Sequence, residues 1–383
     1  TVPEGLQSAL EAEAIENLES VFFNRYGQFI YREPRGRHAG YALPELGIHR
    51  GKLHRIMYRA ALERLGASHV HTDHRCVGVD QSESGAVIHF ERMSDHSPLP
   101  DVVADVVIAC DGVNSFLAKE AGLFSHIEPE HYTVGVKETI SLGKDTIDER
   151  FGLRGLEGAD FEMIGCTEGI PGGGFLYTNL DTVAVGVVLQ VTALGAQSKR
   201  PEEIIAGVKA HPSIAPLLEG GEVKEYSAHL IPEGGFNMMP ELSCDGMLVA
   251  GDAAAMCLAA GIWLEGVNFA IGSGIAAGQA AVDALRRGDT SDAGLAGYRQ
   301  RMETNFVLAD HRKLRGVADL IMSERVQSVY PQLACNVAER IFTVENPRPK
   351  PGFNAIVRSE IKAAGVKLRD LAKDGITGLK GYG

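Results

Sequence analysis

The sequence predicts an α/β fold with a second, antiparallel-sheet domain and a helical C-terminal region. Two almost wholly apolar runs, residues 102–110 and 247–250, suit strands that are buried on both faces, as in a parallel sheet. Residues 132–141 and 182–191 instead alternate Val and Ile with small residues, which indicates an antiparallel sheet. Residues 288–383 are mostly helical by pattern.

The other elements follow from local patterns. Residues 8–20 are rich in Ala, Glu and Leu and predict a short helix, and the aromatic–polar alternation of residues 21–32 predicts a hairpin with its turn at Gly27. Apolar residues recur at helical spacing over residues 52–65 and stop at Gly66, which predicts an amphipathic helix. Further strands are predicted at residues 75–81 and 86–92, and further helices at residues 202–210, 213–218 and 264–286.

Composition excludes several classes of protein. The 383 residues include 37 basic and 50 acidic side chains, and a net charge of −13 repels nucleic acid. The most apolar stretch, residues 246–285, is interrupted by Asp252, Glu265 and Asp283, so no spanning helix is predicted. Six cysteines without CxxC spacing exclude a zinc knuckle and a cysteine-ligated cluster, and they predict a reducing, cytoplasmic location. Peripheral contact with the inner membrane stays open.

Two acidic residues directly follow the apolar strands, each beside a glycine. Asp111-Gly112 follows one strand, and Gly251-Asp252 follows the other. Open α/β sheets bind ligands at their carboxyl edge, where a carboxylate and bare backbone can meet a cofactor. The alternative at both places is a plain or tightly packed turn. Arg50, just ahead of a predicted helix, is either a cation for a diphosphate or a solvated surface residue.

The order and spacing of these motifs resemble the FAD domain of the p-hydroxybenzoate hydroxylase-like flavoprotein superfamily. Residues 22–111, with Gly47-Ile48-His49-Arg50, resemble flavin-dependent aromatic monooxygenases. Residues 111–383 resemble FixC-like electron-transfer flavoprotein–quinone oxidoreductases through motifs such as Tyr132-Thr133-Val134-Gly135 and Pro232-Glu233-Gly234-Gly235. The resemblance implies an incomplete Rossmann-like FAD-binding domain (46–125 and 244–287), an antiparallel-sheet substrate or acceptor domain (126–243) that residues 1–45 join, and a helical region (288–383).

FAD is the cofactor that this resemblance implies. The positions that match the family's cofactor-binding motifs are Arg50, Asp111, Gly112, Gly251, Asp252, Gly261, Glu265, Gly266 and Asn268. The last three match the stretch near the flavin pyrimidine, although an ordinary first helical turn also favours an acidic residue. No catalytic side chain is predicted, because the flavin ring carries the redox chemistry. The thirteen histidines lack metal-ligand spacing, so no metal is predicted.

One expected motif is missing. Members of the superfamily bind the FAD pyrophosphate on a G-x-G-x-x-G turn at a helix N-terminus, and nothing before Arg50 offers that turn. We therefore expect either an N-terminally truncated chain or a fusion of two family members, with weakened FAD binding.

The function implied by the resemblance is FAD-dependent electron transfer from an electron-transfer flavoprotein to quinone or to a ferredoxin-like protein. Cys335 is the only cysteine after Cys257, so no cluster is expected in the C-terminal part, which favours the FixC-like branch with its separate ferredoxin-like partner. Two alternatives stay open: an NAD(P)H- and O2-dependent aromatic monooxygenase, and a non-catalytic remnant that folds without flavin.

Overall fold

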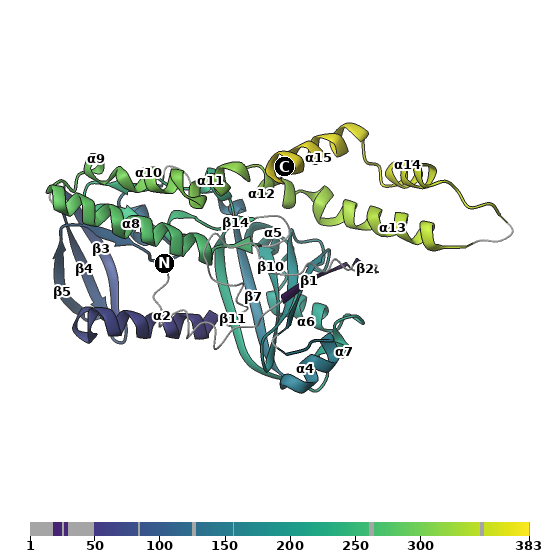
Figure 1. Ribbon diagram of the computed structural model, residues 1–383, viewed down its shortest axis with the longest axis horizontal. Helices are drawn as coiled ribbons and strands as arrows, with labels where there is room; N and C mark the ends of the chain where they lie inside the picture. Colours follow the sequence, from purple (N-terminus) through teal and green to yellow (C-terminus); the bar gives the residue numbers. More distant parts are fainter. Residues whose placement is uncertain are drawn as a thin grey trace.

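The computed structural model describes residues 18–24, 27–29, 50–82, 85–124, 128–155, 157–259, 264–344 and 348–382. Within these residues the strands form four sheets, and the helices that follow residue 266 pack along one side of the molecule and continue into a C-terminal arm (Figure 1). The fold is α/β, as predicted. Residues 47–49 and Gly261, which the sequence analysis singled out, lie outside the described residues.

The largest sheet has seven strands in the order β11-β7-β10-β9-β8-β1-β2. They are β1 (Leu18–Asn24), β2 (Gly27–Phe29), β7 (Tyr132–Ser141), β8 (Gly158–Ile164), β9 (Gly172–Thr178), β10 (Thr182–Gln190) and β11 (Glu222–Pro232). All neighbours pair antiparallel except β1 and β8, which are parallel. The antiparallel sheet and the N-terminal hairpin are confirmed, but the turn is not at Gly27, which pairs with Asn24 as the first residue of β2. The helix predicted for residues 8–20 is wrong from Leu18 onward, because that segment pairs with β8 as a strand.

One face of this sheet buries a core of its own. Val183, Val185 and Val187 of β10 are completely buried, and helix α6 (Pro201–Lys209) packs Ile204 and Ile205 against them. Helices α4 (Lys144–Phe151), α5 (Val191–Gln197) and α7 (Ala215–Leu218) complete this part. The alternating pattern therefore gives one sheet face to the core, as expected for antiparallel strands.

A second, smaller sheet holds the two apolar strands that the sequence analysis paired. β6 (Val107–Ala109) runs parallel to β13 (Met247–Val249), and β12 (Ser243–Cys244) pairs antiparallel on the other side of β13. The long helix α8 (Val267–Arg287) covers this sheet with buried glycine, serine and alanine residues, so helix and strands approach closely. A two-stranded sheet, β14 (Leu258–Ala259) and β15 (Leu264–Glu265), precedes α8.

The prediction of one strand over residues 102–110, buried on both faces, is wrong. Residues 98–104 form β5 (Pro98–Ala104), which is the edge strand of an antiparallel sheet with β3 (His74–Ser82) and β4 (Gly85–Arg92). Val102 is 49% and Val103 80% exposed, because β5 lies at the edge of its sheet, where one side of the strand has no neighbour. Of the predicted strand 102–110, only residues 107–109 (β6) belong to the parallel pair with β13.

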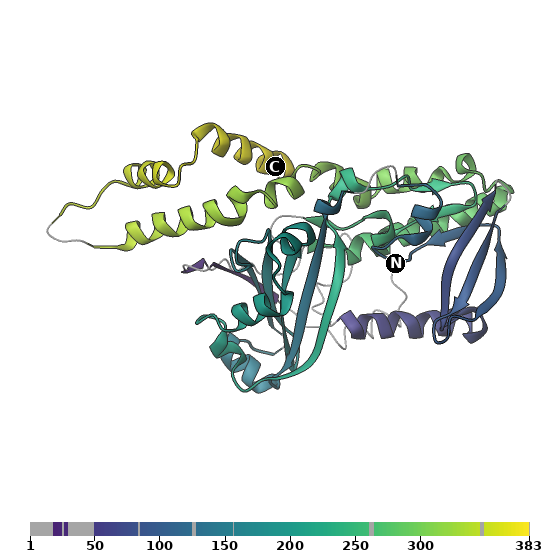
Figure 2. The ribbon, with the colours of Figure 1, turned by 180° about the vertical axis from the view of Figure 1, so that it is seen from behind.

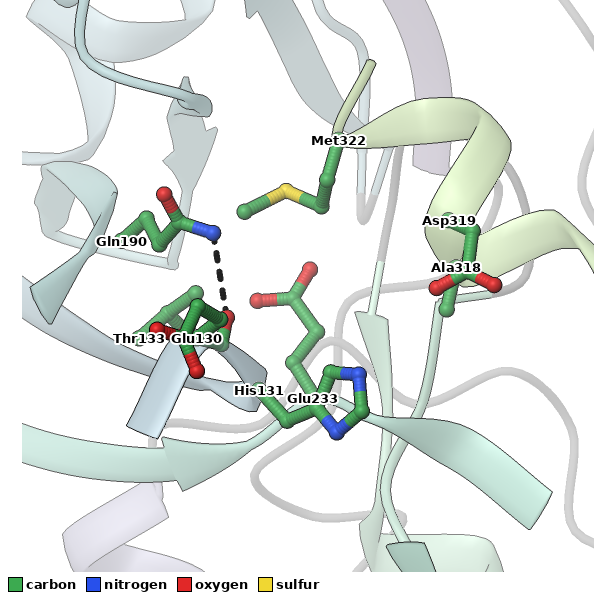
Figure 3. Close-up of a pocket in the computed structure, with 8 residues that line it drawn as sticks. All are labelled: Glu130, His131, Thr133, Gln190, Glu233, Ala318, Asp319 and Met322. Atoms are coloured by element: carbon green, nitrogen blue, oxygen red, sulfur yellow. Dashed lines mark hydrogen bonds between the residues drawn. The ribbon is translucent and has the colours of Figure 1, made fainter. Parts of the chain in front are cut away.

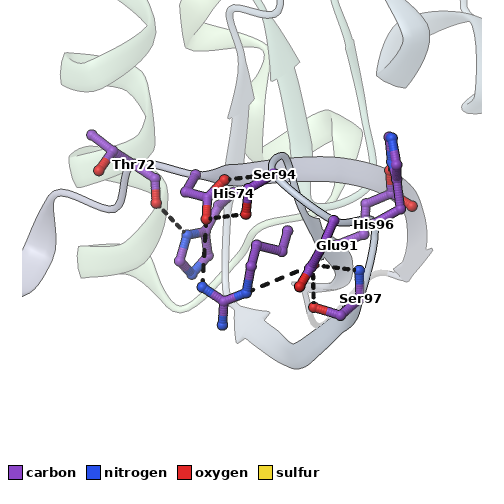
Figure 4. A network of polar contacts seen from close by, with 9 residues as sticks. Thr72, His74, Glu91, Ser94, His96 and Ser97 are labelled. Carbon is purple, nitrogen blue, oxygen red and sulfur yellow. Dashed lines mark hydrogen bonds and ion pairs between the residues drawn. The ribbon is translucent and has the colours of Figure 1, made fainter.

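Polar side chains join the ends of β3 and β4 (Figure 4). The backbone N–H of Ser94 donates to the Asp73 carboxylate at 2.8 Å, and Glu91 forms an ion pair with Arg75 at 2.6 Å. Helix α2 (Arg50–Leu65) precedes this sheet and ends at Gly66, as predicted. Its apolar side chains stay largely open to solvent, since Met57 is 41% and Leu65 58% exposed.

The C-terminal region is helical, as predicted. It comprises α9 (Asp292–Leu295), α10 (Gly297–Thr304), α11 (Phe306–Lys313), α12 (Val317–Ile321), a π-helical turn η5 (Arg325–Val329), α13 (Tyr330–Phe342), α14 (Phe353–Ala363) and α15 (Leu368–Tyr382). Helix α13 projects from the body as an arm, α14 runs back beside it, and α15 returns to the body next to α12 (Figures 1 and 2). Gln327 anchors the base of the arm, because its side chain accepts from the backbone N–H of Gly172 at 2.9 Å.

No helix among the described residues is long and apolar enough to cross a membrane. The same residues contain no group of three or more His, Cys, Asp or Glu side chains placed to hold a metal ion.

Candidate functional site

The parallel pair β6 and β13 brings the two Asp-Gly motifs to the same sheet edge. The backbone N–H of Ala250 donates to the carbonyl of Ala109 at 3.0 Å, which extends the pairing to the end of both strands. Just beyond, the hydroxyl of Ser115 donates to the carbonyl of Ala253 at 2.6 Å, in a fully buried position. Segments 138 residues apart in sequence therefore share one edge, where open α/β sheets bind their ligands.

Asp111 and Gly112 shape the turn after β6. The Asp111 carboxylate accepts from the backbone N–H of Leu117 at 3.0 Å, in the first turn of helix α3 (Phe116–Glu120), so it has the turn role that the sequence left open. Gly112 has a φ of +77°, a left-handed conformation that costs other residues about 1 kcal/mol. A Cβ at Gly112 would meet no atom within 4 Å, so its backbone is open to a ligand. Cofactor binding by this pair stays a prediction.

Gly251 lies where the end of β13 packs closely against α8. It begins a 3-10 turn, η4 (Gly251–Ala254), with a φ of +64°, and its backbone N–H donates to the buried hydroxyl of Ser273 at 3.0 Å. A Cβ at Gly251 would lie 3.3 Å from Cβ of Ala270. The glycine thus lets the N-terminal half of α8 pack directly on the turn that carries Asp252.

Asp252 lies beside the N-terminus of α8 with its carboxylate partly exposed. The side chain is 31% exposed, and its Oδ2 lies 3.9 Å from Nε2 of His229 on β11. A Cβ at Gly266, the residue before α8, would lie 3.9 Å from Oδ1 of Asp252, which places this carboxylate next to the start of α8. Asn268 donates to the Glu265 carboxylate at 2.9 Å, and the N-cap residue of α8 is Gly266, which has no side chain with which to cap the helix.

These residues offer an acceptor next to a row of donors. The carboxylate of Asp252 can accept from a hydroxyl, while the uncapped N–H groups at the start of α8 and the positive end of its dipole favour oxygen acceptors. FAD presents both kinds of group, with hydroxyls on its ribityl chain and carbonyl oxygens on its pyrimidine ring. The described residues therefore fit the flavin end of FAD.

Two predicted site residues cannot be placed. Arg50 is the first residue of α2, but its side chain is not among the described parts of the chain. Gly261 lies outside the described residues altogether. Their cofactor roles stay predictions.

The structure adds three residues that the sequence analysis did not select for the site. His229 lies against Asp252, and the buried thiol of Cys257 lies 3.8 Å from a Cβ position on Gly266. Burial raises the pKa of Cys257 well above its usual value, and the charges of Glu233, Asp252 and Glu265 act in the same direction. Glu233 itself is only 8% exposed, and burial raises the pKa of its carboxyl to about 7. The Pro232-Glu233-Gly234-Gly235 motif was the one available signal for it.

Comparison with known proteins identifies the family to which the chain belongs. Residues 318–382 match the ETF-QO/FixC family C-terminal domain. The chain is 41% identical over 277 residues to "Protein FixC" of Salmonella typhimurium, covering 72% of this chain and 64% of that protein. It is 38% identical over 276 residues to "Probable electron transfer flavoprotein-quinone oxidoreductase YdiS" of Escherichia coli, with the same coverage. The chain thus spans just under two thirds of the length of these relatives.

Solved structures share the fold. A geranylgeranyl bacteriochlorophyll reductase-like protein from Thermoplasma acidophilum superposes with a TM-score of 0.65 at 15% identity, covering 95% of this chain and 88% of that chain. At this identity the likeness concerns the fold alone.

Proposed function

The chain is a relative of the FixC proteins and of electron transfer flavoprotein-quinone oxidoreductases, and from this premise we propose that it acts in an FAD-dependent oxidoreductase. In this proposal it passes electrons from an electron-transfer flavoprotein to quinone or to a ferredoxin-like protein. The observation that carries the proposal is the shared edge of β6 and β13, where Asp252 lies beside the uncapped N-terminus of α8.

The flavin, when bound, supplies the redox chemistry, and the chain's residues position it. Asp252 accepts a hydrogen bond from a ribityl hydroxyl, and the backbone at Gly266 and Asn268 donates to the oxygens of the ring. Gly112 and Gly251 let the main chain come close to the cofactor, because neither has a Cβ and both have positive φ. Arg50, Asp111, Gly261 and Glu265 complete the proposed binding set.

The experiment is anaerobic reduction of the FAD-loaded protein, followed by flavin absorbance. Reduced electron-transfer flavoprotein should bleach the flavin, and a quinone analogue or ferredoxin should restore its colour. NAD(P)H without that flavoprotein is the matched control. Fast reduction by NAD(P)H, with oxygen consumed when an aromatic compound is added, would replace the proposal by the monooxygenase. Protein that stays colourless after FAD is added would favour the non-catalytic remnant.

A further inference from the structure

A cavity of about 180 Å³ lies where the ends of the large sheet meet helix α12. Its walls include Thr133 of β7, Gln190 of β10, Glu233 just after β11 and Met322 just after α12. Figure 3 shows the Glu233 carboxyl extending into the space between Gln190 and Met322. Since a water molecule occupies about 30 Å³ in the liquid, the cavity has room for about six.

Two buried polar groups face this cavity. Oε2 of Glu233 and the hydroxyl of Thr133 make no hydrogen bond of ordinary length and angle within the described residues, although Glu233 is 8% exposed and Thr133 not at all. The Thr133 hydroxyl nevertheless lies close enough to Glu233 to lower the pKa of its carboxyl. A buried carboxylate without donors is costly, so its neutral form is favoured. Burial accordingly raises the pKa of Glu233 to about 7, and the neighbouring Thr133 hydroxyl acts in the opposite direction.

Strand β11 links Glu233 to the candidate cofactor site, because Glu233 directly follows this strand and His229 on it lies 3.9 Å from Asp252. Cys257 is buried, and the charges of Glu233, Asp252 and Glu265 all raise the pKa of its thiol. The three carboxyl groups therefore act on the same buried side chain. Glu233 is the member of this set that also reaches the cavity.

We infer that Glu233 exchanges protons between the cavity and the candidate cofactor site, and that it takes up a proton when the cofactor is reduced. This inference rests on the proposed function. A flavin that accepts a pair of electrons takes up protons as well, and negative charge that develops near Glu233 favours its protonated form. The electrons come from the reductant, and the protons come from water in the cavity.

The charged groups around Glu233 also favour the protonated form of its carboxyl. Glu130 and His131, from the 3-10 turn η2 (Pro129–His131), and Asp319 of α12 line the cavity with it. Nδ1 of His131 lies 3.2 Å from Oε2 of Glu128, and Nε2 of His229 on β11 lies 3.9 Å from Oδ2 of Asp252. The acidic surroundings favour the neutral carboxyl, which makes protons available near neutral pH.

The first test needs no cofactor. Infrared spectra of the apo protein between pH 5 and 9 should show a carboxyl that loses its proton near pH 7 (about one pH unit either way). Glu233→Gln should remove this carboxyl signal, while Glu130→Gln, which changes the same charge at an exposed position of the same cavity, should leave it. Thr133→Val keeps the carboxyl and should move its titration to higher pH, so the test survives a Glu233 variant that fails to fold.

The second test is proton uptake during chemical reduction of the FAD-loaded protein in weak buffer. We expect wild type and Glu130→Gln to take up more protons per electron pair than Glu233→Gln near neutral pH. Equal uptake in all three, absence of a Glu233-dependent titration, or failure to bind FAD would each overturn the inference. If uptake depends on Glu233 but electron-transfer flavoprotein does not reduce the protein, the proposed function fails and the inference stands.

Discussion

Two buried titratable groups with opposite effects should make the stability of this protein depend weakly on pH, and removing one should expose the other. Burial raises the pKa of Glu233 from 4.5 to about 7, and burial lowers the pKa of His311 from 6.5 to about 4. His311 is fully buried, donates to the carbonyl of Val307 at 2.7 Å and packs its ring edge-on against Phe269 at 4.4 Å.

The signs follow from which state holds the proton. Between pH 4.5 and 7 the folded state keeps the Glu233 proton that the unfolded state has lost, so Glu233 lowers stability as pH rises. Between pH 4 and 6.5 the unfolded state holds a proton on His311 that the folded state lacks, so His311 raises stability as pH rises. Each contribution changes by about 1.4 kcal/mol per pH unit, or about 3 kcal/mol over its window.

The assay is urea unfolding of wild type, Glu233→Gln and His311→Gln at a series of pH values. The stability of Glu233→Gln relative to wild type should rise by about 3 kcal/mol from pH 4.5 to 7, whereas that of His311→Gln should fall by about as much from pH 4 to 6.5. Glu130→Gln, at an exposed position of the same cavity, is the matched control for the loss of one carboxylate. Differences that do not change with pH would refute the reasoning for both groups.

Three further predictions concern the site and the C-terminal arm. Asp252→Ala should weaken FAD binding roughly tenfold or more by loss of a charged hydrogen bond, as measured by flavin fluorescence titration. Asp145→Ala on α4 is its control, and a lowered apo melting temperature with unchanged affinity would defeat the cofactor role. Asp374→Asn should destabilise α15 by about 1.5–3 kcal/mol, because Asp374 accepts from Arg325 Nε and from the Tyr330 hydroxyl, both at 2.6 Å. The Arg325 partner lowers the pKa of Asp374, so this stabilisation is lost as the pH falls through that lowered pKa. The measurement is the rate at which a protease cleaves α15 at different pH values, and a rate that is the same at every pH would contradict the prediction. Gln327→Ala removes bonds to Gly172 and Ile321 and should cost about 1–3 kcal/mol, visible as a lower melting temperature, whereas an unchanged one would mean that the arm is anchored elsewhere.

Local patterns predicted the frame of the site. The apolar strand before Gly251 and the small residues of α8 specify a buried strand and a closely packed helix, and both are present. The same reasoning failed for residues 102–110, because β-branched residues look alike on an exposed edge strand and in a buried one. Val103 shows the difference only once β5 is seen to lie at a sheet edge.

The tertiary neighbours of the site could not be predicted in this way. Glu233 stands in a Pro-Glu-Gly-Gly segment that is typical of a polar turn, and it is buried because the end of β11 meets α12, some eighty residues later in the chain. His229 belongs to an ordinary alternating strand, and its nearness to Asp252 depends on how β11 meets η4. Such contacts arise from packing between elements, which no local pattern encodes.

The bond between Ser115 and Ala253 also bears on the order in which the chain folds. It closes a loop of 138 residues, and this loop contains most of the large antiparallel sheet. Bringing distant segments together costs loop entropy, and contacts of large sequence separation slow folding. During synthesis the large sheet can collapse first, whereas the edge that bears Asp111 and Asp252 forms only after α8 has been made. Maturation of the candidate cofactor site is therefore a late folding event, and refolding with and without FAD should differ mainly in its slowest phase.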